Sequence, residues 1–199
     1  MPARTPLDAN AILAATEQIL RRHGPDKATV VDVARALGVS HAAVYKHFPS
    51  KQALREAVTR RWLDRNRDAL AVIAADSAVP PVQRLRTWLH AVLAVKQAKI
   101  REDPELFAAY GILAAAHSSV ATDHVADLLG QLTAIIADGA ADGSLRTDDA
   151  EATAHVVFNA TAKFHHLAHA AEWQHPGVGA ELDEVCNLLL EGLHVPTSP

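Results

Sequence analysis

Residues 29–51, TVVDVARALGVSHAAVYKHFPSK, carry hydroxyl, imidazole and ammonium groups at spacings that suit contact with a nucleic acid. Hydroxyl and ammonium groups bind phosphate oxygens, and side chains near the start of a helix can reach base edges in the major groove. The candidates are Ser40, His41, Tyr45, Lys46 and Lys51. They can act together only if one short element presents them on a common face.

The same stretch predicts two short helices joined by a tight turn. Thr29 and Ser40 have the side-chain oxygen that an N-cap residue uses to accept a backbone hydrogen bond. Gly38 lies between them and can adopt the left-handed conformation that ends a helix. The apolar contacts would come from Val33, Leu37, Val39 and Val44. This is the layout of a helix-turn-helix, whose second helix enters the DNA major groove.

Charge is distributed unevenly along the chain. The whole sequence carries a net charge of −4, but residues 1–61 carry +5 and residues 62–199 carry −9. A basic block that contains the helix-turn-helix, followed by an acidic remainder, indicates a localised contact with phosphates.

Helical periodicity and Gly/Pro breaks predict an all-α chain of about nine helices. We expect an N-terminal unit of three helices, followed by a longer helical region. The expected ranges are 7–23, two helices within 29–47, 50–75, 80–101, 104–117, 118–141, 148–173 and 179–193.

Composition places the protein in a broad class. Apolar residues make up 49% of the chain and charged residues 21%, as in ordinary folded proteins. Cys186 is the only cysteine, which excludes an intrachain disulfide and favours a reducing compartment. No segment reaches the ~20 apolar residues of a membrane span. We therefore expect a cytoplasmic protein with no membrane association.

The N-terminal third resembles the TetR family of bacterial transcriptional repressors. The resemblance covers about 50 residues and depends on an ordered set of motifs: ILAA at 12–15, TVVDVA at 29–34, LGVS at 37–40, VYKHF at 44–48 and SKQAL at 50–54. It implies a helix-turn-helix DNA-binding domain over residues 1–50, linked by helix 50–75 to a helical effector-binding and dimerisation domain over residues 51–199.

The resemblance also implies roles for individual residues. Thr29, Tyr45 and Lys51 would contact phosphates. The base-facing start of the recognition helix, with Lys46 beside it, would comprise Ser40, His41, Ala42 and Ala43. Alanine offers only apolar contact, for example with a thymine methyl group, so hydrogen-bonded readout would fall to His41 and Lys46.

A homodimer is implied as well, with the last two helices of each subunit forming a four-helix bundle. Two-fold symmetry would place two recognition helices about one DNA turn (~34 Å) or more apart on double-stranded DNA with a near-palindromic operator. The implied function is a transcriptional regulator, in the first instance a repressor, that a small-molecule effector releases from its operator. Repressor and activator are not distinguished by the sequence.

The histidines bear on which effector could bind, because nine of the twelve follow Arg61 and so lie in the longer helical region. On a continuous helix over 148–173, His155, Asn159, His166 and His169 would share one face, with His165 just beside it. Three interpretations stay open: the stripe lines a ligand pocket, it lies on an interface or the surface, or it binds a transition metal through His165, His166 and His169.

The residues expected to surround an effector are aromatic, amide and imidazole groups of the longer helical region. For each aromatic residue taken singly, ordinary core packing is at least as well supported. They are Trp88, Phe107, Tyr110, His117, Phe158, Asn159, His166 and His169.

Two other functions compete with an effector-controlled regulator. One is a helical metal-binding protein or metalloenzyme built on the His-rich helix 148–173, or a metal-responsive repressor. The other is a DNA-binding dimer with no effector. The sequence contains no paired carboxylate–histidine motif and no nucleophile with an adjacent base, so we expect no enzyme. No cofactor is certain, and a transition metal is the one candidate.

Overall fold

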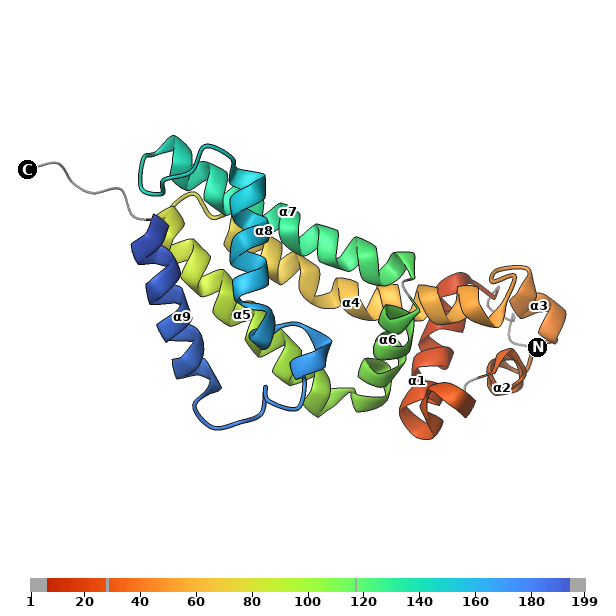
Figure 1. Ribbon diagram of the computed structural model, residues 1–199. Coiled ribbons are helices and arrows are strands. Elements are labelled where there is room, and N and C mark those ends of the chain that lie inside the picture. The colour runs from red at the N-terminus through yellow and green to blue at the C-terminus, as the bar shows by residue number, and fades with distance from the viewer. Residues whose placement is uncertain (1–6, 28, 117, 194–199) are drawn as a thin grey trace, which may run out of the picture. The chain divides into compact units, whose positions relative to one another are not determined.

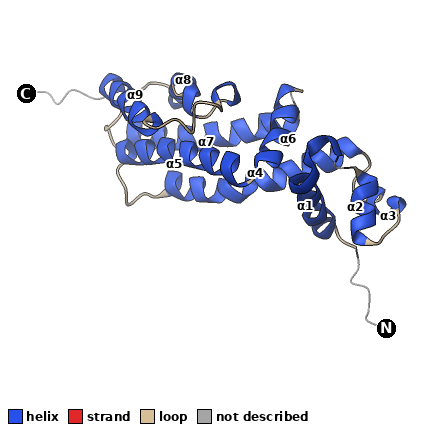
Figure 2. Cartoon of the chain, turned by 90° about the horizontal axis from the view of Figure 1, so that it is seen from below, coloured by secondary structure: helices blue, strands red, loops and turns tan. Residues whose placement is uncertain are grey.

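A computed structural model describes residues 7–27, 29–116 and 118–193 of the chain, and Figure 1 shows their helices. The elements are α1 (Ala9–Lys27), α2 (Val30–Leu37), α3 (His41–Tyr45), α4 (Lys51–Ala75), α5 (Pro81–Glu102), α6 (Pro104–Ala115), α7 (Ser119–Ala141), α8 (Ala150–Ala160) and α9 (Val178–Leu193). Over these ranges the chain forms helices and loops without a strand, as Figure 2 shows. The expected all-α class is confirmed.

The helices form two compact units. Unit 1 comprises residues 1–64 and 100–122, and unit 2 comprises residues 65–99 and 123–199. Helices α4, α5 and α7 each contribute residues to both units. None of the described helices is both long and apolar enough to span a membrane.

The first three helices of unit 1 enclose a small apolar core. Val33, Ala34 and Val44 have no exposed surface, and Ile12 of α1 and Leu54 of α4 are buried beside them. Leu37 and Val39 pack against this core from the turn between α2 and α3. The apolar residues predicted to hold the helix-turn-helix together therefore do so.

Helix α1 is interrupted where the sequence predicts its end. Gly24 has φ 73° and ψ 173°, which no helical residue adopts, and Pro25 follows it. The positive φ suits glycine because it has no Cβ.

Unit 2 has a larger apolar core. The fully buried side chains include Trp88 of α5, Ile135 and Ile136 of α7, and Leu182 of α9. The buried guanidinium of Arg84 joins two further segments, since it donates to Ala74 O at 2.7 Å and to Asp138 Oδ2 at 2.8 Å.

The expected helix over 148–173 is wrong, because α8 ends at Ala160. The Thr161 hydroxyl donates to Val157 O at 2.9 Å, and the His165 imidazole lies 2.9 Å from Phe158 O. Thr161 N also donates to Val157 O, whereas Phe158 O, which a continuing helix would bond through its own backbone, contacts the His165 side chain instead. Two short 3₁₀ turns follow, Ala162–Phe164 and Leu167–His169. The histidines after Ala160 therefore do not share a helical face with His155.

Candidate functional site

The helix-turn-helix is built by three local devices, all predicted from the sequence. Thr29 Oγ1 accepts from Asp32 N at 3.2 Å and caps α2, and Ser40 Oγ accepts from Ala43 N at 3.2 Å and caps α3. Gly38 has φ 64° and ψ 33°, the left-handed conformation. Val39 N then donates to Ala34 O at 3.0 Å, which closes the turn.

Two apolar side chains set the orientation of α3. Val44 is fully buried and Phe48 is 9% exposed, so both point into the core of unit 1. Tyr45, next to Val44, is 48% exposed. Because neighbouring helical positions lie about 100° apart, fixing Val44 inward leaves the opposite face of α3 to solvent.

The residues expected to read DNA lie at or near this exposed face. Ser40, His41, Ala42 and Lys46 are exposed, and Ala43 is partly buried. Helix α3 itself ends at Tyr45, so Lys46 and His47 follow in a turn rather than on the helix. That these residues contact bases stays a prediction.

The expected phosphate contacts have mixed exposure. Lys51 is exposed at the first position of α4, where the Ser50 hydroxyl accepts from Ala53 N at 2.9 Å. Thr29 is partly buried, and its hydroxyl donates to the Asp32 carboxylate. Hydrogen bonding to Thr29 lowers the pKa of the Asp32 carboxyl, which keeps it negatively charged at the start of α2.

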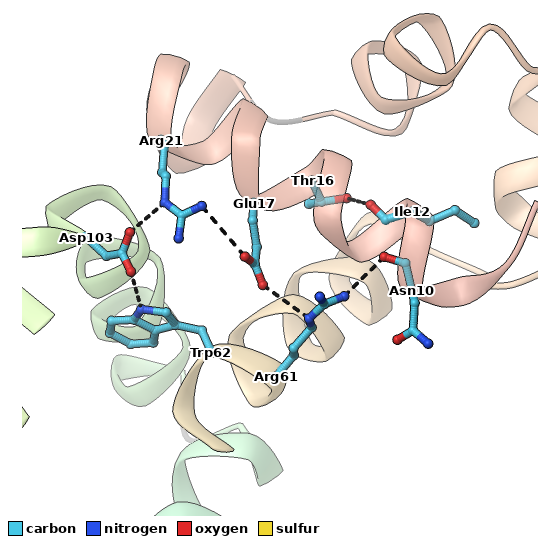
Figure 3. Close-up of polar contacts among 8 residues, drawn as sticks. All are labelled: Asn10, Ile12, Thr16, Glu17, Arg21, Arg61, Trp62 and Asp103. Carbon is cyan, nitrogen blue, oxygen red and sulfur yellow. Dashed lines mark hydrogen bonds and ion pairs between the residues drawn. The ribbon is translucent and has the colours of Figure 1, made fainter. Parts of the chain in front are cut away.

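A charged network within unit 1 joins α1, α4 and the start of α6, as Figure 3 shows. The Glu17 carboxylate, 7% exposed, lies 3.8 Å from Arg21 Nη1 and 3.5 Å from Arg61 Nε. Asp103, which precedes α6, accepts from Arg21 Nε at 2.6 Å and from Trp62 Nε1 at 3.0 Å. The hydrogen bond to Asp103 raises the pKa of Arg21.

Part of the positive charge of residues 1–61 is used in contacts within unit 1. Arg61 Nη1 donates to Asn10 O at 3.1 Å, and Arg55 Nη2 donates to Pro25 O at 3.1 Å. These arginines, with Arg21, hold α1 against its neighbours. The excess of +5 in residues 1–61 is therefore partly structural, and Lys46 and Lys51 are the first exposed cations that follow α3 in sequence.

The residues expected around an effector are divided between the units. In unit 1, Phe107 is partly buried, and the ring of buried Tyr110 lies 6.4 Å from that of Trp62. Burial raises the pKa of the Tyr110 hydroxyl. His117 lies outside the described residues.

In unit 2, the expected effector residues have different surroundings. Trp88 is fully buried and its Nε1 donates to Gln131 Oε1 at 2.9 Å, as a core residue does. Phe158 packs on the His165 ring with 4.0 Å between ring centroids. Asn159 and His166 are exposed, and His169 Nδ1 lies 2.8 Å from Glu172 Oε1.

The expected metal site is not formed. Within the ranges that the structure describes, no three His, Cys, Asp or Glu side chains are placed to hold a metal ion. The three histidines lie in the turns after α8 rather than on a helix, and His165 is buried while His166 is exposed. The geometry on which His165, His166 and His169 were expected to share a metal is therefore absent.

The sequence did not predict that four bases of unit 2 lie together, a group that we call the basic cluster: Lys96 and Lys99 of α5, His124 of α7, and His165. Exposure is 5% for Lys96, 7% for Lys99 and 8% for His165, and His124 is partly buried. A signal for the lysines was present. The buried stripe of α5 runs through Leu85, Trp88, Leu89 and Val92, and its helical spacing continues onto Lys96 and Lys99.

Within the basic cluster, Lys96 Nζ lies 3.3 Å from His124 Nε2. Burial lowers the pKa of Lys96 to about 8. Burial, with the positive charges of Lys96 and Lys99, lowers the pKa of His124 to about 3. Burial is also the main reason that the pKa of His165 falls to about 4, although its contact with Phe158 O opposes the change.

Comparison with known families places two parts of the chain. Residues 12–58 match the family described as bacterial regulatory proteins, tetR family. Residues 81–186 match the family described as tetracyclin repressor-like, C-terminal domain.

Two curated relatives come from Mycobacterium tuberculosis. An uncharacterized HTH-type transcriptional regulator is 33% identical over 105 residues, which is 53% of this chain and 50% of the relative. An HTH-type transcriptional repressor is 29% identical over 119 residues, 57% of this chain and 62% of the relative. The match thus spans about half the length of the first relative.

Solved structures are similar over almost the whole chain. A TetR transcriptional regulator from Streptomyces coelicolor is 27% identical with a TM-score of 0.52, and the match covers 96% of this chain and 100% of that one. A protein of unknown function from Rhodococcus sp. RHA1 is 26% identical with a TM-score of 0.73, covering 98% and 100%.

Proposed function

The chain belongs to the TetR family of bacterial regulatory proteins, and we propose that it is a homodimeric repressor that a small-molecule effector releases from its operator. The observation that carries this proposal is the capped helix-turn-helix with α3 anchored by Val44 and exposed on the other side. We assign DNA binding to residues 1–50, and effector binding and dimerisation to residues 51–199. Regulation, not catalysis, is the proposed activity.

The DNA contacts follow from what α3 and its neighbours expose. Lys51 and Tyr45 offer an ammonium group and a hydroxyl for phosphates, and His41 with Lys46 offers the donors for base edges. Ala42 and Ala43 add no hydrogen bond. Specificity then depends on few direct contacts together with phosphate register and DNA shape.

Exposed apolar side chains on the last two helices support the homodimer. Val156 of α8 is 63% exposed and Leu188 of α9 is 71% exposed. On α9, Val178, Leu182 and Cys186 occupy the buried face. A second copy of the chain that covers the exposed residues of α8 and α9 would bury this apolar surface.

Control by an effector requires that ligand binding favour a state with weaker DNA affinity, with a coupling free energy of ~1–3 kcal/mol. The network of Glu17, Arg21 and Asp103 supports such coupling, because it fixes the start of α6 to the helices that carry the DNA-binding motif. A shift of α6 would strain these charged contacts. A dimer that binds DNA without any effector is the alternative.

Selection of a duplex from a random double-stranded DNA library by the intact protein tests the DNA-binding proposal. We expect a near-palindromic sequence whose affinity falls steeply with salt. Lys51→Ala should reduce the slope of log affinity against log salt by about 0.9 for each protomer. Tyr45→Ala should weaken binding to the same duplex.

Lys163→Ala, in unit 2, is the matched control, since it removes a lysine that lies outside the motif and contacts Glu181. It should leave the salt slope unchanged. The proposal fails if no duplex is enriched, or if Lys51→Ala, Tyr45→Ala and the control all bind the selected duplex equally.

A further inference from the structure

The basic cluster brings basic side chains from three separate segments of unit 2 together in its interior. Lys96 and Lys99 come from α5, His124 from α7 and His165 from the turn after α8. Lys96 Nζ contacts a second base, His124 Nε2, at 3.3 Å, and its charge also acts on His165. The three most buried members are less than a tenth exposed.

Such a placement costs free energy, because lysine is rarely buried and cations near one another repel. The depressed pKa values of Lys96, His124 and His165 record this cost. Near neutral pH, Lys96 keeps most of its charge while the two imidazoles are neutral. The cluster then offers at least one cationic donor together with the N–H of a neutral imidazole, and donors of both kinds can hold an anion.

The surroundings of the cluster are apolar and aromatic. The Phe158 ring packs on His165, Phe164 is 3% exposed, and Trp173 has no exposed surface. Gln97, next to Lys96, donates to Trp173 O at 2.6 Å and holds that segment against α5. His124 is partly exposed, so the cluster reaches the surface of unit 2 at that side chain. A ligand suited to both features carries one anionic group on an apolar body.

We propose that the basic cluster binds the carboxylate of an organic acid. The carboxylate accepts from Lys96 Nζ in place of the His124 contact, and the His124 ring turns its N–H toward it, while His165 Nε2 keeps its contact with Phe158 O. The acid is then the effector that weakens DNA binding, and this role rests on the proposed function. No covalent step is involved.

Direct binding to the intact protein tests the site independently of DNA. We would titrate acetate, benzoate and octanoate, with acetamide, benzamide and octanamide as uncharged partners, at constant ionic strength and up to about 10 mM, which detects even a millimolar dissociation constant. At least one acid should bind about tenfold or more tightly than its amide, and Lys96→Met should remove this preference. Because an anion raises the pKa of neighbouring bases, calorimetry in two buffers should show proton uptake on binding.

Lys163→Met, a lysine of the same unit that is 41% exposed, is the control and should keep the preference. The site is refuted if no acid binds, if acids and amides bind alike, or if Lys96→Met binds acids as well as the original chain does. Duplex binding is measured separately. Acids that bind without releasing the selected duplex would contradict the effector role but not the site, and failure to bind any duplex would contradict the proposed function alone.

Discussion

The DNA-binding motif and the basic cluster use the same chemical groups in opposite settings. Around α3, ammonium, imidazole and hydroxyl groups stand in solvent above an apolar layer formed by Val44 and Phe48. In the basic cluster, the ammonium groups of Lys96 and Lys99 take positions that continue the apolar stripe of α5, and imidazoles from other segments join them. Exposed groups cost little to keep, whereas buried ones lower stability, and the proposed binding site would offset that cost.

The largest effect should come from the apolar end of the α5 stripe. Trp88→Ala removes a fully buried indole and should lower the free energy of unfolding by about 3–5 kcal/mol. Urea denaturation followed by circular dichroism measures this. Val72→Ala, at a position 70% exposed on α4, is the control and should change stability by less than about 0.5 kcal/mol. A small effect of Trp88→Ala would mean that the stripe is not the core of unit 2.

At the other end of the α5 stripe, replacing Lys96 should raise the free energy of unfolding rather than lower it. Lys96 is protonated in both the folded and unfolded protein below its folded pKa of about 8, so the full cost of burying the charge is present at pH 7. As pH rises toward the ordinary value of 10.5, the folded protein loses the proton first and the cost disappears. The difference between these two pKa values corresponds to a free energy of about 3 kcal/mol.

Lys96→Met should therefore raise the free energy of unfolding at pH 7 by up to about 3 kcal/mol, with a gain that shrinks between pH 8 and 10.5. Parallel urea denaturation of both proteins across this range cancels the titration of other groups, such as Tyr110. A variant that is less stable at pH 7 would show that contacts of the ammonium outweigh its burial, and the contrast with the exposed motif would disappear.

The two regions also differ in how far the sequence predicts them. Thr29, Gly38 and Ser40 act on backbone groups within five residues, so their roles follow from residue type and order. Helix α8 ends early because His165 reaches back to Phe158 O, a contact that no propensity encodes. Lys96 and His124 meet only after α5 and α7 have packed. Contacts between residues close in sequence can thus be predicted from the sequence, whereas contacts between residues far apart in sequence cannot.

A smaller effect tests the turn of the motif. Gly38→Ala puts a Cβ at φ 64°, where the cost for alanine is about 1–2 kcal/mol, and no atom lies within 4 Å of the new Cβ. The loss should therefore be conformational only and visible in urea denaturation. Gly130→Ala, in the exposed part of α7 with no neighbour within 4 Å, should instead stabilise unit 2 by up to about 1 kcal/mol. Equal effects at both positions would contradict the left-handed turn.

The smallest effect concerns one oxygen atom and tests the exposed side of the comparison most closely. Tyr45 is 48% exposed, and its ring could serve either by packing or by presenting its hydroxyl to a phosphate. Tyr45→Phe keeps the ring, so folding stability should stay within about 0.5 kcal/mol. Affinity for the selected duplex should fall by the worth of one hydrogen bond per protomer, about 0.5–1.5 kcal/mol, measured by fluorescence anisotropy at fixed salt. Tyr45→Phe that binds DNA normally while Tyr45→Ala unfolds more easily would assign the residue to packing. If Tyr45→Phe weakens DNA binding alone, the Tyr45 hydroxyl serves DNA binding and does not stabilise the fold. The Lys96 ammonium differs, because burying it lowers the stability of the fold.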